Sequence, residues 1–164
     1  MLPRPWPGSF VAMDDVAQLS RLARARGLRV AVAESLTSGT LAGAVGEGEQ
    51  ASEWFAGGIV AYMIDTKERL LGLQPGTDPC SAACAEQLAR GARELFDVDI
   101  AVSTTGVGGP DAEDGHPPGT VFLGWATRSA AGHRQLSIDG DPDRVLTATV
   151  EAAVRMLTFH AAEA

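Results

Sequence analysis

The stretch LRVAVAESLTSGTLAGAV, residues 28–45, decides the fold of this chain. Residues 28–33 form a short run rich in valine and alanine, which is typical of a buried β-strand. The polar turn 34–39 follows at once, and residues 40–45 resume an apolar pattern at helical spacing before glycines end it. A buried strand that leads through a polar turn into a helix predicts one unit of an α/β fold.

Helical and extended patterns alternate on both sides of this stretch. Further helices are predicted at residues 16–26, 65–71, 82–96 and 142–160. Further strands are predicted at residues 54–63, 100–104, 119–127 and 133–138, and the last two are expected to form a hairpin around residues 129–132. Because the alternation ends in consecutive strands, we predict an α/β fold, a three-layer α/β/α sandwich with a mixed central sheet.

The size of the chain fits one domain. Its 164 residues are 45% hydrophobic and 21% charged, which is ordinary for a globular protein. We expect a single domain over residues 14–164, preceded by a proline-containing flexible extension at residues 1–13. No run of about 18 apolar residues predicts a transmembrane helix, and the first residues do not resemble a signal peptide. The expected location is therefore the cytoplasm, without a membrane partner.

The charge of the chain disfavours a nucleic-acid partner. The formal net charge is −8, and an acidic surface repels phosphate backbones unless basic residues gather locally. The densest group of cationic residues indicates a solvated helix face rather than a nucleic-acid site. This group consists of Arg21, Arg24, Arg26 and Arg29.

The two cysteines do not predict a metal site. Cys80 and Cys84 are four residues apart, which suits half a zinc site on a helix, but no second pair of ligands lies at a matching spacing. We expect both to act as small buried apolar residues and predict neither metal nor cofactor.

The polar turn after the first strand is the first candidate binding segment. Ser35, Thr37 and Ser38 offer hydroxyl groups there, and Gly39 permits a close approach of the backbone. The start of a helix presents free N–H groups, which favour an anion such as phosphate. The alternative is that the serine, threonine and Glu34 side chains of this turn only cap the helix.

Tyr62 and Lys67 follow the second predicted strand. A serine needs a base before it acts as a nucleophile, and a lysine whose pKa is lowered by burial is one such base. We therefore predict a Ser35–Lys67 pair, provided that the two strands are neighbours. The alternatives are a solvent-exposed Lys67, and a Tyr62 that packs its ring rather than relaying a proton.

A glycine-rich turn follows the third predicted strand. Residues 105–110, TGVGGP, include Thr105, Gly106 and Gly109, and ligands of open α/β sheets bind where strands end. The turn matches neither a Walker loop nor a dinucleotide fingerprint, and a simple tight turn is the alternative. Three polar segments after three strands nevertheless predict one shared site.

Taken in order, these segments resemble the CinA C-terminal domain family. The family patterns Ala-Glu-Ser-Cys-Thr-Gly-Gly, Tyr-Ser-Asn-x-x-Lys, Thr-Gly-Ile-Ala-Gly-Pro, Pro-Val-Gly-Thr-Val and Gly-Asp-Arg are similar to residues 33–39, 62–67, 105–110, 117–121 and 140–142. The enzymes of that family are nicotinamide mononucleotide deamidases. The resemblance implies that Ser35 is the nucleophile, Lys67 its base and Tyr62 their neighbour, with a small nucleotide substrate and no metal. Together with the apolar strand at 55–63, it also implies a homodimer or larger homo-oligomer.

Several residues depart from the family patterns. Leu36 and Ser38 replace cysteine and glycine, Met63 and Ile64 replace Ser-Asn, and Pro142 replaces the arginine of Gly-Asp-Arg. Basic residues are also missing at Leu146 and Thr147, so Arg144 is the remaining candidate to contact a phosphate. Three hypotheses follow: an amidohydrolase of nicotinamide mononucleotide or a related nucleotide, a catalytically silent binding module, and a hydrolase of another small amide.

Overall fold

A computed structural model describes residues 13–164. The predicted extension at residues 1–13 lies outside the described residues except for Met13, which begins helix α1 (Met13–Arg26). This helix therefore starts three residues before the predicted position. Asp14 and Asp15 lie in its first turn, where their negative charges stabilise the helix by interacting with the positive end of its dipole.

Five strands form one mixed sheet in the order β2-β1-β3-β4-β5. The strands are β1 (Val30–Glu34), β2 (Phe55–Val60), β3 (Ile100–Gly106), β4 (Thr120–Thr127) and β5 (Ala131–Ser137). The first three run parallel, whereas β4 is antiparallel to β3 and β5 is antiparallel to β4. The carboxyl ends of β1, β2 and β3 consequently meet at one edge of the sheet.

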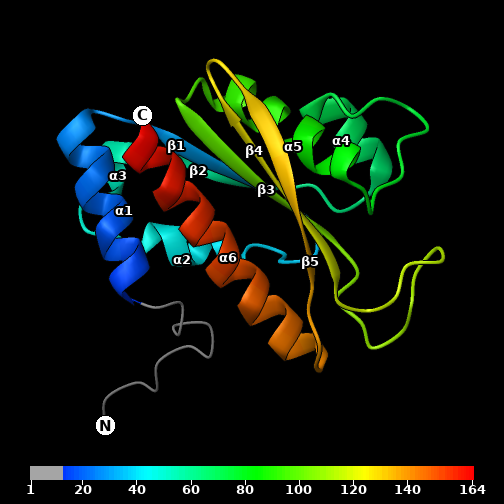
Figure 1. Ribbon diagram of the computed structural model, residues 1–164. Helices are drawn as coiled ribbons and strands as arrows, with labels where there is room; N and C mark the ends of the chain where they lie inside the picture. Colours follow the sequence, from blue (N-terminus) through cyan, green and yellow to red (C-terminus); the bar gives the residue numbers. More distant parts are fainter. Residues whose placement is uncertain (1–12) are drawn as a thin grey trace, which may run out of the picture.

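Helices cover both faces of the sheet, as Figure 1 shows. One face carries α1, α2 (Thr40–Gly46), α3 (Ala51–Trp54) and the long α6 (Pro142–Glu163), and the other carries α4 (Ile64–Leu71) and α5 (Ala82–Phe96). Two apolar clusters fill the space between these layers. Val32 and Leu157 belong to the first cluster, and Leu71 and Leu88 belong to the second. The predicted three-layer α/β/α sandwich with a mixed sheet is confirmed.

The strand at 54–63 was predicted too long. Residues 51–54 form the short helix α3, because the indole Nε1 of Trp54 donates to the carbonyl of Glu49 and the ring is buried in the core. Strand β2 then ends at Val60, and Ile64 already belongs to α4. The second strand of the hairpin begins at Ala131, two residues before the predicted start, so the turn is shorter than predicted.

None of the helices within residues 13–164 combines the length and the apolar character needed to cross a membrane.

Candidate active site

The residue that follows β1 is Ser35, and the sheet holds its backbone in place. The register pairs Glu34 with Val60 on β2 and with Thr104 on β3, so the next residue lies between these two neighbours. The backbone N–H of Ser35 donates to the carbonyl of Thr104 at 3.1 Å. The hydroxyl group therefore emerges at the edge of the sheet where three parallel strands end, as the sequence predicted.

The side chain of Lys67 reaches this hydroxyl group from α4. Its Nζ lies 3.1 Å from Ser35 Oγ and also donates to the main-chain carbonyl of Tyr62. Lys67 is the only lysine in the sequence, and it is 2% exposed, which is rare for a lysine. The alternative of a solvent-exposed Lys67 is wrong.

Burial changes the acid–base chemistry of this amine. Loss of solvent lowers the pKa of Lys67 from its ordinary value of 10.5, and the nearby Cys84 opposes this shift. A lowered pKa leaves more of the amine neutral at a given pH, so its lone pair can accept the proton of Ser35. The carbonyl of Tyr62 accepts one N–H and thereby fixes the direction of the remaining groups on Nζ.

The Tyr62 side chain is 63% exposed. Its ring centroid lies 6.0 Å from Lys67 Nζ, at the outer limit of a cation–π contact. The ring therefore stands beside the amine at the mouth of the site, while the backbone of the same residue makes the hydrogen bond.

A small hollow of about 130 Å³ opens beside the Ser35–Lys67 pair. Of the predicted residues, the hollow brings together Ser35, Tyr62, Lys67, Thr105 and Gly106. Its remaining lining consists of Ile64, Pro79, Cys80, Val107, Glu113, Asp114 and His116. The three predicted segments thus converge, as expected from the parallel strands.

The other predicted binding residues do not line this hollow. Thr37 is buried and its hydroxyl group lies 2.8 Å from that of Thr104. Ser38 donates to the carbonyl of Ser35 at 3.3 Å, and Gly39 adopts a φ of 100° just before α2. The side chains of Thr37 and Ser38 therefore bond to β3 and within the turn itself, and they do not cap α2.

Glu34 supplies the cap of α2, so the capping alternative holds for this residue of the turn. Its carboxylate accepts hydrogen bonds from the backbone N–H groups of Leu41 at 2.8 Å and Ala42 at 3.0 Å. The carboxylate is buried and occupies the start of the helix, where an anion was expected to bind. An internal carboxylate therefore takes the position that a phosphate would need there.

Gly109 and Arg144 also lie outside the lining. Gly109 has a φ of 87°, and a Cβ at this position would lie 3.1 Å from the side chain of Pro118. Arg144 is exposed in the first turn of α6, where its backbone N–H donates to the Asp141 side chain at 2.9 Å. The structure does not bring its guanidinium group into the hollow.

One wall of the hollow, a tight turn at residues 113–116, was not predicted from the sequence. Glu113 and His116 exchange two backbone hydrogen bonds of 3.1 and 2.8 Å. The two residues between them, Asp114 and Gly115, both have positive φ values, 48° and 81°, as a type I′ turn requires. The Asp-Gly pair was the available signal, because this dipeptide is favoured in such turns.

His116 is tied to the loop that precedes α5. Its Nε2 lies 2.8 Å from Asp78 Oδ2. Burial raises the pKa of Asp78, but the N–H of Cys80 and the contact with His116 outweigh burial and lower this pKa overall.

Both cysteines are buried and free, as predicted for small apolar residues, and burial raises the pKa of each thiol to about 11. These thiols therefore stay protonated at neutral pH.

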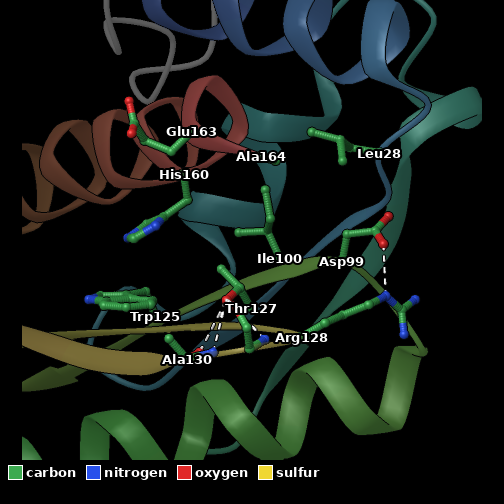
Figure 2. A pocket seen from close by; sticks show the side chains of 11 residues that line it. Leu28, Asp99, Ile100, Trp125, Thr127, Arg128, Ala130, His160, Glu163 and Ala164 are labelled. Carbon is green, nitrogen blue, oxygen red and sulfur yellow. Dashed lines mark hydrogen bonds and ion pairs between the residues drawn. The ribbon is translucent and has the colours of Figure 1, made fainter.

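A larger hollow of about 410 Å³ lies at the opposite edge of the sheet. Figure 2 shows the ring of Trp125 against that of His160, and Arg128 bonded to Asp99. Size alone would favour this hollow, but among the described residues that line it no hydroxyl group is hydrogen-bonded to a basic side chain. The smaller hollow is therefore the better candidate active site.

The fold agrees with the comparisons. The family model described as CinA C-terminal domain matches residues 14–160. A competence-damaged protein (CinA) superfamily protein from Klebsiella pneumoniae has a similar structure, with a TM-score of 0.87 at 28% identity over 93% of this chain and 98% of the other. A superfamily protein from Escherichia coli gives a TM-score of 0.86 at 28% identity over 97% and 95%. This chain belongs to the CinA C-terminal domain family.

Two curated proteins of the same family are similar to this chain in sequence. A putative competence-damage inducible protein of Bacillus subtilis is 40% identical over 122 residues, which is 70% of this chain. A CinA-like protein of Geobacter metallireducens is 38% identical over 144 residues, 85% of this chain. The match spans only 29% and 35% of the length of these relatives.

Proposed function

We propose that this chain is a Ser–Lys amidohydrolase and that nicotinamide mononucleotide, or a related pyridine nucleotide, is its substrate. The observation that carries the proposal is the distance of 3.1 Å between Lys67 Nζ and Ser35 Oγ in a buried setting. The resemblance to deamidases of the family supplies the substrate class.

The first half of the reaction acylates the serine. Lys67 accepts the proton of Ser35 as Oγ attacks the carboxamide carbon, and backbone N–H groups of the turn after β1 stabilise the tetrahedral oxyanion. The C–N bond then breaks, the proton on Lys67 passes to the nitrogen, and ammonia leaves. A nicotinoyl ester of Ser35 remains.

The second half restores the enzyme. Lys67 accepts a proton from water, whose oxygen attacks the ester carbon. The bond to Ser35 Oγ breaks, the proton returns from Lys67 to that oxygen, and nicotinic acid mononucleotide is released. The scheme uses one nucleophile and one base and needs no metal or redox group.

The direct test is ammonia release from nicotinamide mononucleotide by the purified chain. The proposal expects ammonia and nicotinic acid mononucleotide in equal amounts, with turnover that exceeds the enzyme concentration. A silent binding module would bind the nucleotide and release neither product.

A second candidate is the hydrolysis of another small amide. One observation favours it: within residues 13–164, Lys67 is the only lysine or arginine that lines the hollow, so nothing there offers a permanent cation to a phosphate. Ammonia release from non-phosphorylated amides, with none from the nucleotide, would support this candidate.

A further inference from the structure

His116 and Asp78 form a hydrogen-bonded pair beside the hollow, separate from the Ser35–Lys67 pair. The Nε2 atom of His116 lies 2.8 Å from Asp78 Oδ2. The imidazole ring is half-buried and lines the hollow, whereas Asp78 is not part of the lining. A carboxylate that binds one ring nitrogen of a histidine selects the tautomer of the ring and leaves the other nitrogen for a ligand.

The surroundings of Asp78 determine which nitrogen of His116 carries the hydrogen. Although burial raises the pKa of Asp78, the N–H of Cys80 and the contact with His116 lower it overall, so the carboxylate is ionised at neutral pH and can only accept. Its Oδ1 accepts the backbone N–H of Cys80 at 2.9 Å, and its Oδ2 accepts from His116 Nε2. In the neutral imidazole, Nδ1 then offers a lone pair, and it has no hydrogen-bond partner within residues 13–164.

A carboxamide bound at Ser35 needs an acceptor for its nitrogen. The NH₂ group carries two N–H donors, and a donor that is buried without a partner weakens binding. The hollow holds only about 130 Å³, so a carboxamide whose carbon meets Ser35 Oγ lies close to every wall. The other side-chain oxygens are less suited, because the Thr105 hydroxyl group donates to the carbonyl of Pro79 and the carboxylate and phenol groups of the lining are exposed.

We propose that Nδ1 of His116, oriented by Asp78, accepts one N–H of the substrate carboxamide and holds the leaving nitrogen in place. This inference rests on the proposed function for the position of the carboxamide at Ser35. With one N–H held by His116, the lone pair on nitrogen in the tetrahedral intermediate can face Lys67, which returns the proton taken from Ser35. The C–N bond then breaks and ammonia leaves, so His116 itself exchanges no proton.

The first test compares an amide with an ester that forms the same acyl-enzyme. The substrates are nicotinamide mononucleotide and the methyl ester of nicotinic acid mononucleotide, whose alkoxy oxygen has no N–H to donate. Removing the acceptor in His116→Leu should lower kcat/KM about tenfold or more for the amide and less than about threefold for the ester.

His133→Leu is the matched control for this comparison. His133 makes the same kind of pair, with its Nδ1 at 2.7 Å from Glu86 Oε1, but it lies outside the lining of the hollow. Both rates should therefore stay within about threefold of the parent, because an exposed pair contributes little to the fold.

Asp78→Asn tests the orientation without removing the imidazole. The N–H of Cys80 keeps the amide oxygen of the asparagine on its side, so the NH₂ group faces His116 Nε2. This nitrogen must then accept, and the ring hydrogen moves to Nδ1, which can no longer accept from the carboxamide. The amide rate should fall about tenfold while the ester rate stays within about threefold, a difference that a purely structural loss would not produce.

Nitrogen NMR spectra of protein with isotope-labelled histidine provide a readout that does not need turnover. At about pH 8, where imidazole groups are mostly neutral, the parent should show the hydrogen of His116 on Nε2, and Asp78→Asn should show it on Nδ1. In Ser35→Ala, binding of the amide should move the Nδ1 resonance towards that of a hydrogen-bonded acceptor, and binding of the ester should not. His116→Leu assigns the resonance.

Three results would overturn the proposal: a hydrogen on Nδ1 in the parent, an Nδ1 resonance that does not respond to the amide, or equal changes of the amide and ester rates in His116→Leu. If the parent hydrolyses neither substrate but the amide still moves the Nδ1 resonance, the proposed function fails and the role of His116 in binding the carboxamide stands.

Discussion

The amine of Lys67 lies 3.1 Å from the hydroxyl oxygen of Ser35, although 32 positions separate them in the sequence. The contact depends on two neighbouring parallel strands, because β1 delivers Ser35 and the chain beyond β2 delivers Lys67 to the same edge. Family membership places this pair in a known fold, and the hydrolase function proposed above rests on the pair.

Replacing Lys67 by methionine tests the role of the amine. Methionine fills much of the same buried volume but has no basic nitrogen, so ammonia release should fall by about 10²-fold or more. The folded state should survive, because a buried amine is exchanged for an apolar group. Steady-state rates and thermal unfolding measure the two effects. Activity within threefold of the parent would show that Lys67 is not the base.

The pKa of Lys67 should control the pH dependence of the reaction. Since burial lowers this pKa, kcat/KM should rise with pH and level off below the ordinary lysine value of 10.5. Because Lys67 is the only lysine, labelling with [13Cε]lysine gives one side-chain resonance whose titration reports this pKa directly. A titration at or above 10.5 would contradict the prediction.

The free energy of unfolding should also depend on the protonation of Lys67. The lowered pKa means that the unfolded chain binds this proton more tightly than the folded chain does. The Lys67 contribution to the free energy of unfolding therefore rises as pH increases from the folded-state pKa towards 10.5. The thiols of Cys80 and Cys84 titrate near this range in both proteins, so the difference in unfolding free energy between the parent and Lys67→Met isolates the Lys67 contribution. Urea unfolding should show that this difference changes in favour of the parent as pH rises, and a difference that is independent of pH would contradict the prediction.

Two glycines of the same turn should respond differently to alanine. Gly106 has a φ of 146°, and a Cβ there would overlap the carbonyl of Thr120, whereas a Cβ on Gly108 meets nothing within 4 Å. Gly106→Ala should cost about 2 kcal/mol or more of unfolding free energy, and Gly108→Ala less than about 0.5 kcal/mol. Urea unfolding measures both, and similar values for the two would contradict the packing described for β3 and β4.

The Glu34 cap of α2 is a further test. Glutamine at this position presents an N–H₂ group to the donors of Leu41 and Ala42, so one buried hydrogen bond is lost. The free energy of unfolding should fall by about 1–3 kcal/mol. The exposed Glu47→Gln serves as the control and should change stability by less than about 0.5 kcal/mol. An unchanged free energy of unfolding in Glu34→Gln would show that the cap is not a stabilising contact.

Most of the fold could be predicted because its signals are local. Residues 82–96 form a helix between Ser81, whose hydroxyl group caps the start, and Asp97, and both limits were predicted. Helix α3 could not be predicted, because four residues carry no helical period and the burial of Trp54 in the core depends on tertiary packing.

The Ser35–Lys67 pair and part of the lining of the candidate site, including Thr105 and Gly106, could be predicted, but the rest of the lining could not. The types of Ser35 and Lys67 suggested a pair, whereas their distance depends on strand order, which the sequence pattern does not specify. The turn at 113–116 was read only as part of a long loop, so its carboxylates escaped notice. Arg144 was selected by its charge, and its exposed position on α6 could be found only from the three-dimensional arrangement.

The central claim is that Ser35 attacks the amide, and ammonia release by matched serine variants tests it most directly. The parent, Ser35→Ala and Ser52→Ala are assayed side by side with nicotinamide mononucleotide and nicotinamide riboside; Ser52 is exposed on α3, outside the lining of the hollow. The account predicts ammonia from the parent and from Ser52→Ala, and at least a 10³-fold loss in Ser35→Ala with unchanged thermal unfolding. Ammonia from Ser35→Ala at the parental rate would contradict it.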